Sequence, residues 1–243
     1  MENNMKFTEG YWLLSERTNG QFASQAYHIE AMENGLRVVA PTSPVLSRGD
    51  TLNRPTITIE FLAVSPEVIS VRAWHYEGYR TGEARFEKKE TTCDAVVTIT
   101  ENEAVLDAGR VSVHVDRKNW GYSFWADGKL LTSSGFHNLG YVRWDKRVSS
   151  MLPQDNYMKE HEYTPYMTQD LLLAPGENVY GFGERFTAFV KNGQAVETWN
   201  EDGGTASQVA YKNIPFYMTN RGYGVFVDHT GNVSFEVASE KVE

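Results

Sequence analysis

The chain has 243 residues, of which 41% are hydrophobic, enough to fill the core of one large domain. Its 23 basic and 32 acidic residues give a net charge of −9, and no basic stripe with interleaved aromatics occurs, which argues against nucleic-acid binding. No apolar run reaches the roughly 18 residues that a membrane-spanning helix needs, and the first residues form no secretion signal, so we expect a cytoplasmic protein without a membrane partner.

Hydrophobic residues alternate with polar ones along much of the chain, a period of two that is typical of half-buried strands. This pattern predicts strands over 57–61, 69–73, 97–100, 111–116, 225–227 and 233–237. In the first of them Ile57, Ile59 and Phe61 form the apolar side. Helical spacing is weak throughout, so the sequence predicts an all-β fold.

Turn pairs that tolerate positive φ separate these runs: Asn34-Gly35, Asp127-Gly128, Asn192-Gly193 and Gly231-Asn232. Such pairs favour hairpins, and we therefore expect a large two-sheet antiparallel β-sandwich with little helix. The stretches Pro41 to Pro55 and Met151 to Pro165 are predicted to be long loops. Neither has a linker composition, so residues 1–243 are interpreted as a single domain.

Polar chemistry concentrates in the last third of the chain. Residues Tyr180 to Phe186 read Tyr-Gly-Phe-Gly-Glu-Arg-Phe, in which Gly181 and Gly183 permit close backbone approach and Glu184 is expected to be braced by donors such as Arg185. The loop that begins at Trp199 and Asn200 continues through Asp202 to two glycines. An aromatic face with amide and carboxylate oxygens is suited to binding a sugar.

These blocks, together with Asn213-Ile-Pro-Phe-Tyr, resemble the N-terminal region of glycoside hydrolase family 31, most closely its bacterial α-xylosidases. The resemblance is dense from about Leu171 to Val242 and thin before it. It implies a β-sandwich of the galactose-mutarotase type that precedes a catalytic (β/α)8 barrel. Because the barrel motifs with both catalytic carboxylates are missing, we expect a truncated chain that is inactive alone although its parent is a retaining glycoside hydrolase.

The resemblance further implies that the Trp199–Asp202 loop reaches the sugar pocket of the barrel, with Asp202, Trp199 and Asn200 as substrate-binding residues. Glu201 stands where a basic residue is frequent in such relatives. We expect the loop from Trp199 to Thr205 to be poorly ordered without the barrel. An exposed apolar patch near Phe182, Phe186 and Phe216 is expected to mark the face that the barrel covers.

Two other functions remain open at this stage. The 19 Trp and Tyr residues provide material for an autonomous carbohydrate-binding module, and an aldose-epimerase-like enzyme on the same fold would need a His acid and a Glu base in one cleft. The six histidines are scattered singly, so no metal site is predicted, and no cofactor is expected. The expected partners are an α-linked oligosaccharide or xyloside and the missing barrel, with a homo-oligomer possible.

Overall fold

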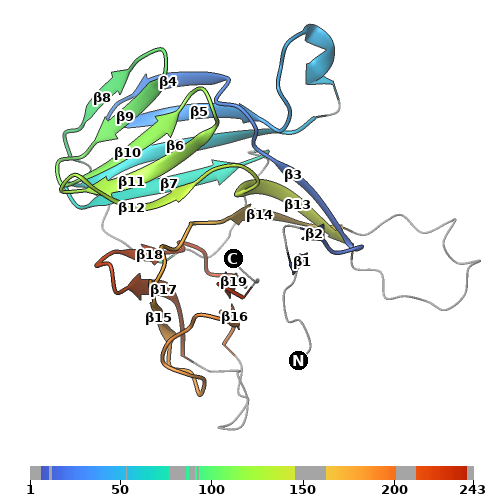
Figure 1. Ribbon diagram of the computed structural model, residues 1–243, viewed down its shortest axis with the longest axis vertical. Helices are drawn as coiled ribbons and strands as arrows, with labels where there is room; N and C mark the ends of the chain where they lie inside the picture. The colour runs from blue at the N-terminus through green and yellow to red at the C-terminus, as the bar shows by residue number, and fades with distance from the viewer. Residues whose placement is uncertain are drawn as a thin grey trace, which may run out of the picture. The chain divides into compact units, whose positions relative to one another are not determined.

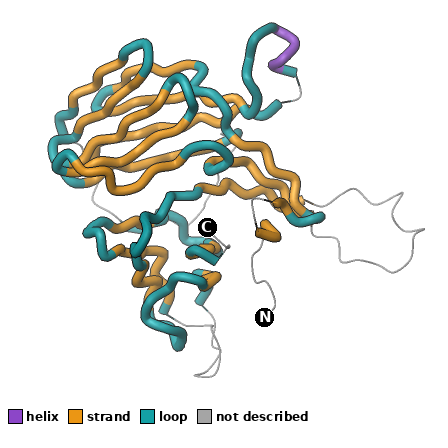
Figure 2. The backbone as a smooth tube through the Cα atoms, viewed as in Figure 1, coloured by secondary structure: helices purple, strands orange, loops and turns teal. Residues whose placement is uncertain are grey.

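The structure is a computed structural model that describes residues 7–10, 13–52, 54–76, 86–87, 91, 93–145, 163–200 and 212–239 (Figures 1 and 2). The chain divides into two compact units. Unit 1 comprises Met1–Leu13, Tyr79–Lys89 and Leu173–Glu243, and unit 2 comprises Leu14–Gly78 and Glu90–Leu172. The prediction of one domain over 1–243 stays a prediction.

Unit 2 is built on two antiparallel sheets that lie against each other (Figure 1). The four-stranded sheet has the order β4 (His28–Met32), β5 (Gly35–Pro41), β6 (Thr56–Ser65) and β7 (Val68–Trp74). The five-stranded sheet has the order β12 (Lys129–Ser134), β11 (Gly121–Ala126), β10 (Val111–Asp116), β9 (Glu103–Asp107) and β8 (Val96–Ile99). The predicted all-β antiparallel sandwich is confirmed.

The core of unit 2 lies between these sheets and is formed by every second residue of each central strand. Burying one such aliphatic or aromatic side chain contributes about 1.5–3 kcal/mol, so the alternation predicted from the sequence is also the main source of cohesion. The fully buried members are Leu36, Val38 and Ala40 of β5, Ile57, Ile59 and Phe61 of β6, Ala104 and Leu106 of β9, and Val113 and Val115 of β10.

The opposite face of the four-stranded sheet carries a row of alternating charges. Glu30, Arg37, Glu60 and Arg72 are register partners across β4, β5, β6 and β7. The guanidinium of Arg37 donates to Glu30 at 2.8 Å and to Glu60 at 2.7 and 2.9 Å, and these carboxylates raise its pKa. Because a one-residue slip of any strand would break this row, the charges help to fix the register.

A third antiparallel sheet of unit 2 has the order β14 (Tyr163–Gln169), β13 (Leu139–Asp145) and β3 (Thr18–Phe22). The predicted loop from Met151 to Pro165 is wrong at its end, because β14 begins at Tyr163 and Pro165 pairs with Arg143 in the ladder. The other predicted loop contains one turn of 3-10 helix, η1 (Arg48–Thr51), where Asp50 accepts hydrogen bonds from the backbone of Leu46 and Ser47.

Unit 1 contains smaller sheets. β15 (Val179–Gly183), β17 (Asn213–Thr219) and β18 (Gly224–Phe226) form a three-stranded sheet, and β16 (Gln194–Glu197) pairs with β19 (Ser234–Val237). The strands β1 (Thr8–Gly10) and β2 (Leu13–Leu14) form a short ladder near the start of the chain. The core of unit 1 consists of Val179, Phe182, Val196 and Val237 with Leu173, Tyr217 and Phe235 packed against them.

Two of the four predicted hairpin turns are confirmed. The first hairpin is turned by Glu33 and Asn34, one residue earlier than the predicted pair, because Gly35 already belongs to β5 and pairs with Met32; Asn34 has φ 54°. Asp127-Gly128, at φ 50° and 73°, joins β11 to β12. The predictions at Asn192-Gly193 and Gly231-Asn232 are wrong, because the strands on either side belong to different sheets. Asn192 instead bonds the backbone of Val179 and Glu177, which ties its turn to the start of β15.

Candidate functional site

The Gly-Phe-Gly segment at the end of β15 forms a bulge against β17. Gly181, Phe182 and Gly183 all have positive φ, at 126°, 68° and 84°. A Cβ at Gly181 would lie 2.6 Å from the carbonyl oxygen of Phe216, and one at Gly183 would lie 2.1 Å from that of Lys212. Both positions therefore require glycine for conformation and for space.

The bulge turns the ring of Phe182 into the core of unit 1. Its side chain is 0% exposed, and its ring centroid lies 4.7 Å from Phe235 and 5.7 Å from Tyr217. The expectation that Phe182 belongs to an exposed patch is wrong for this reason. Phe186, at 53% exposure, is open, and Phe216 is half-buried.

The charged pair after the bulge has different partners for its two members. The carboxylate of Glu184 contacts the ammonium of Lys212 at 3.1 Å, in an exposed ion pair. The guanidinium of Arg185 donates to the carbonyl oxygens of Phe182, at 3.2 Å, and Glu197, at 2.6 Å, and to Oδ1 of Asn213. Burial lowers the pKa of Arg185, and the carboxylate of Glu197 opposes this shift.

Asn213, the first residue of β17, connects this arginine to the start of the predicted sugar loop. Its Nδ2 donates to the carbonyl oxygen of Trp199 at 2.7 Å and to Oδ1 of Asn200 at 3.0 Å. Its backbone N–H donates to the same Asn200 oxygen at 3.0 Å. The two ends of the stretch 199–213 are thus held together by one side chain, which we call the Asn213 clasp.

The clasp fixes two of the three predicted substrate-binding residues. Trp199 is 52% exposed, and the amide oxygen of Asn200 is occupied by the two donors of Asn213. Asp202, Glu201 and the rest of the segment to Thr205 lie outside the described residues. The prediction that this loop is poorly ordered therefore stays a prediction.

Lys191 is a buried cation close to Arg185 that the sequence did not single out. It is 4% exposed, and its Nζ donates to Oγ1 of Thr187 at 3.0 Å and to the carbonyl oxygen of Ala188 at 2.7 Å. Burial lowers the pKa of Lys191, and the charge of Arg185 lowers it further. Both cations donate to protein oxygens, so their role in this structure is to hold the segment after the bulge.

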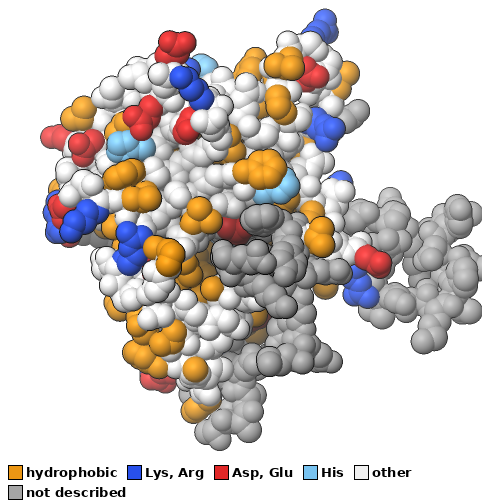
Figure 3. Space-filling view, in the orientation of Figure 1, with side chains coloured by type: hydrophobic (Ala, Val, Ile, Leu, Met, Phe, Trp, Pro, Cys, Tyr) orange, Lys and Arg blue, Asp and Glu red, His pale blue; other side chains and the backbone are white. Residues whose placement is uncertain are grey.

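An apolar face lies on the other side of the three-stranded sheet of unit 1. The outward side chains of β17 and β18 include Ile214, Met218 and Phe226, which are 48%, 51% and 47% exposed. Phe216 and Tyr180 extend this surface, and Figure 3 shows hydrophobic side chains gathered over this part of the molecule. Contiguous apolar surface of this kind marks an interaction site.

The outer face of the five-stranded sheet holds a second polar group of residues. Nδ1 of His114 contacts Glu103 at 2.9 Å, and Nε2 contacts Oγ of Ser112 at 3.1 Å. An epimerase needs its acid and base on different atoms of the sugar, whereas this His and this Glu engage each other directly. The pair is therefore better suited to binding a ligand than to the epimerase reaction.

Within the described part of the chain, no three His, Cys, Asp or Glu side chains gather in a way that could hold a metal ion. The same residues include no helix of the length and hydropathy needed to cross a membrane. The prediction that no cofactor is used is not tested by these observations.

Comparison with known proteins identifies the family. Residues 57–236 match the family model of the glycosyl hydrolase 31 N-terminal galactose mutarotase-like domain. The α-xylosidase XylQ of Lactiplantibacillus pentosus is 40% identical over 98% of this chain and 29% of its own length. An α-xylosidase of Emericella nidulans is 35% identical over 98% of this chain and 31% of its own length.

A solved structure of the cycloalternan-forming enzyme from Listeria monocytogenes, in complex with a pentasaccharide substrate, has the same fold. Its TM-score is 0.66 at 16% identity, over 92% of this chain and 19% of that one. The chain spans about a third or less of the length of these relatives. The sequence match over most of the chain and the antiparallel sandwich agree, and the chain belongs to glycosyl hydrolase family 31, in which it corresponds to the N-terminal galactose mutarotase-like domain.

Proposed function

We propose that this chain is the non-catalytic N-terminal domain of a retaining α-glycosidase that prefers α-xylosides to α-glucosides. The observation that carries the proposal is the match of 98% of the chain to two α-xylosidases, at 40% and 35% identity, over only 29% and 31% of their lengths. The remaining length of such an enzyme would supply the (β/α)8 barrel and its two catalytic carboxylates.

The apolar face of unit 1 supports a role in holding that barrel. Burial of apolar surface contributes about 25 cal/mol per Å², and half-exposed side chains such as Ile214, Met218 and Phe226 offer such surface without further unfolding of the domain. The barrel is the proposed occupant of this face.

An exposed carboxylate paired with a lysine, as in Glu184, is suited to bracing and not to donating a proton.

The Asn213 clasp supports a role for the Trp199–Asp202 loop in substrate binding. A sugar-contacting residue must be held in place to contribute, because ordering costs roughly 1–2 kcal/mol per residue. The clasp provides this order at Trp199 and Asn200, two residues before Asp202 in the sequence. We propose that Asp202 accepts hydrogen bonds from substrate hydroxyls and that Trp199 packs at the base of the loop.

The test is the kinetics of Asp202→Ala in the polypeptide that carries this domain together with its barrel. Loss of charge-assisted hydrogen bonds should lower kcat/KM on an α-xyloside by about tenfold to a hundredfold, with the melting temperature nearly unchanged. The unmodified protein should hydrolyse the α-xyloside faster than the α-glucoside, and the 243-residue chain alone should hydrolyse neither. An unaltered kcat/KM in the variant would show that Asp202 does not contact the substrate and that the loop has no part in binding it.

A further inference from the structure

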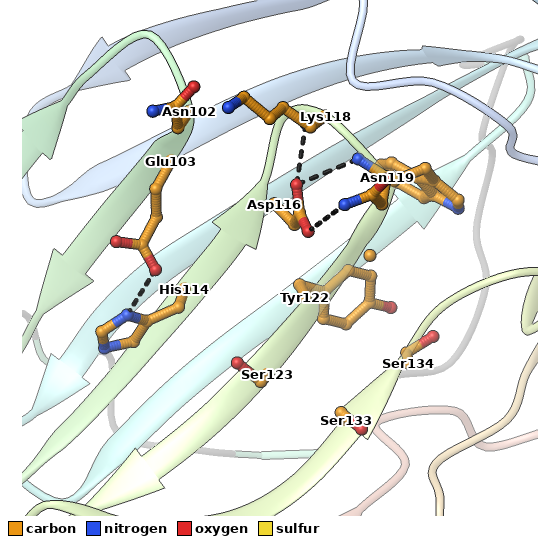
Figure 4. A pocket seen from close by; sticks show the side chains of 12 residues that line it. Asn102, Glu103, His114, Asp116, Lys118, Asn119, Tyr122, Ser123, Ser133 and Ser134 are labelled. Atoms are coloured by element: carbon orange, nitrogen blue, oxygen red, sulfur yellow. Dashed lines mark hydrogen bonds and ion pairs between the residues drawn. The ribbon is translucent and has the colours of Figure 1, made fainter.

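Two hollows lie on the outer face of the five-stranded sheet in unit 2. Their volumes are about 550 Å³ and 280 Å³, and His114 lines both. Figure 4 shows the larger one. The larger extends to the turn after β10 and the smaller to the Asp127-Gly128 turn after β11. We call these two hollows, which both include His114 in their lining, the sheet groove.

The strand register explains why the groove is polar. Val113, Val115 and Tyr122 face the core, so their neighbours in the chain face outward. Across the sheet the outward side chains fall into rows. One row contains His114, Ser123 and Ser133, and the next contains Ser112, Trp125 and Leu130. The groove therefore has a row of hydroxyl and imidazole groups beside an indole with an apolar neighbour.

Several of these groups are held in fixed orientations. Nε1 of Trp125 donates to Oγ of Ser123 at 2.8 Å, and its ring lies 5.6 Å from that of His114. Asp116 accepts hydrogen bonds from the backbone N–H groups of Lys118 at 2.7 Å and Asn119 at 3.0 Å, as Figure 4 shows. These donors hold the pKa of Asp116 below its usual value, so that its carboxylate is an acceptor at neutral pH.

One lining residue has a polar atom that nothing in the described chain satisfies. Trp120 is 5% exposed, lines the larger hollow, and its Nε1–H has no hydrogen-bond partner among the described residues. A buried donor without a partner is unfavourable, so an acceptor that reaches this N–H would be stabilised there. Ser133 also lines the larger hollow (Figure 4).

The charges of the groove select against anions. Carboxylates of Glu103, Asp107, Asp116 and Asp127 line it, against the cations of Lys118 and Arg110. Arg110 is already bonded to Asp127 and Glu67. A ligand that fits must offer hydroxyl groups to oxygen and nitrogen partners and an apolar face to Trp125, without a negative charge of its own.

We propose that the sheet groove binds a neutral oligosaccharide of pyranose units. A pyranose ring presents an apolar face that can stack on Trp125, and the hydroxyls of the other units of the oligosaccharide would bond Ser133 and Asp116. The residues of this site all belong to unit 2, and the proposal does not require that the proposed α-xylosidase activity be correct.

The experiment is calorimetric titration of the protein with isomaltotriose, maltotriose and xylotriose, and with trigalacturonate as the anionic counterpart. We expect binding of at least one neutral trisaccharide and none of trigalacturonate. Trp125→Ala should weaken the binding about tenfold or more, since the stacking surface is lost. Trp74→Ala is the matched control, because Trp74 lies on the outer face of the other sheet beneath Arg72 and should leave the affinity unchanged.

A second variant guards against a general loss of structure. Ser133→Trp places bulk in the groove at a half-buried position and should abolish binding while the circular dichroism and melting profile remain those of a folded sandwich. Failure of every neutral trisaccharide to bind, or unchanged affinity in folded Trp125→Ala, would overturn the proposal. Because Asp202→Ala is measured by hydrolysis and this site by binding, the two proposals can fail separately.

Discussion

The side-chain amide of Asn213 donates to the carbonyl oxygen of Trp199 at 2.7 Å and so joins two segments whose residues are 14 positions apart in the sequence. Asn213→Ala removes this bond, so that the carbonyl oxygen of Trp199 loses this donor and Arg185 loses one acceptor, whereas the backbone N–H of residue 213 still donates to Asn200. We expect the free energy of unfolding to fall by about 1–3 kcal/mol. In the polypeptide with its barrel, kcat/KM on an α-xyloside should fall as well, because the loop base loses its position.

Asn220→Ala is the matched control for this variant. Asn220 also holds a turn of unit 1 with both ends of its amide, accepting from Asn178 at 3.0 Å and donating to Gly176 at 3.1 Å. It should cost similar stability in a chemical denaturation experiment and leave kcat/KM unchanged. Equal kinetic losses in both variants would show that the Asn213 clasp matters only for folding.

Gly183→Ala tests the close approach of the bulge to β17. At Gly183 the new Cβ would meet the carbonyl oxygen of Lys212 at 2.1 Å, at a φ of 84°. Gly176→Ala introduces the same strain at φ 76° with nothing within 4 Å. We expect a loss of roughly 1 kcal/mol for Gly176→Ala and of more than about 3 kcal/mol for Gly183→Ala in thermal denaturation. Similar losses would mean that the bulge relaxes without cost.

The strands of the sandwich could be predicted from the sequence because the alternation of apolar and polar residues shows which side of each strand faces the core. Ile57, Ile59 and Phe61 alternate with polar residues, and the structure buries all three. Phe182 could not be placed in this way, since three consecutive positive φ values break the alternation around it. A glycine pair in sequence indicates freedom at those positions, without indicating which way the ring between them turns.

The sequence segments that form the candidate site could be predicted, but the hydrogen bonds between them could not. The pattern marked Trp199, Asn200 and the segment that begins at Asn213, but their bonds join residues 13 and 14 positions apart, and no local rule gives such pairings. The burial of Lys191 could not be predicted from the sequence either. In sequence it precedes an Asn-Gly pair and has the composition of an exposed turn, whereas the fold buries it against the carbonyl oxygen of Ala188.

Met218→Lys tests the apolar face of unit 1 as the surface that the barrel covers. Met218 is 51% exposed, so in the 243-residue chain the added charge should change the free energy of unfolding by no more than about 0.5 kcal/mol. With the barrel present, the lysine would be buried without a partner, and the melting temperature should fall by several degrees. Val96→Lys, at a 66% exposed position of β8, should be neutral in both proteins. A neutral Met218→Lys in the longer protein would remove this face as the docking surface.

Tyr217→Phe tests the alkaline limit of unit 1. Burial raises the pKa of Tyr217 to about 12, and the carboxylate of Glu177 acts in the same direction. Because the hydroxyl keeps its proton longer in the folded than in the unfolded chain, its contribution to stability is complete below the unfolded pKa of about 10 and is lost as pH rises from there to about 12. The loss across this window is on the order of 2–3 kcal/mol.

Tyr217→Phe keeps the ring contacts with Phe182 and Phe235 and removes the titration. Urea denaturation at pH 8 should therefore give nearly equal stabilities for the two proteins, while at pH 11 the variant should be the more stable. Burial also raises the pKa of Tyr122 in unit 2, so the variant should still lose some stability at high pH. Parallel stability curves from pH 8 to 11 would show that the Tyr217 hydroxyl is solvated in the folded protein and that this part of the core is more open than its packing indicates.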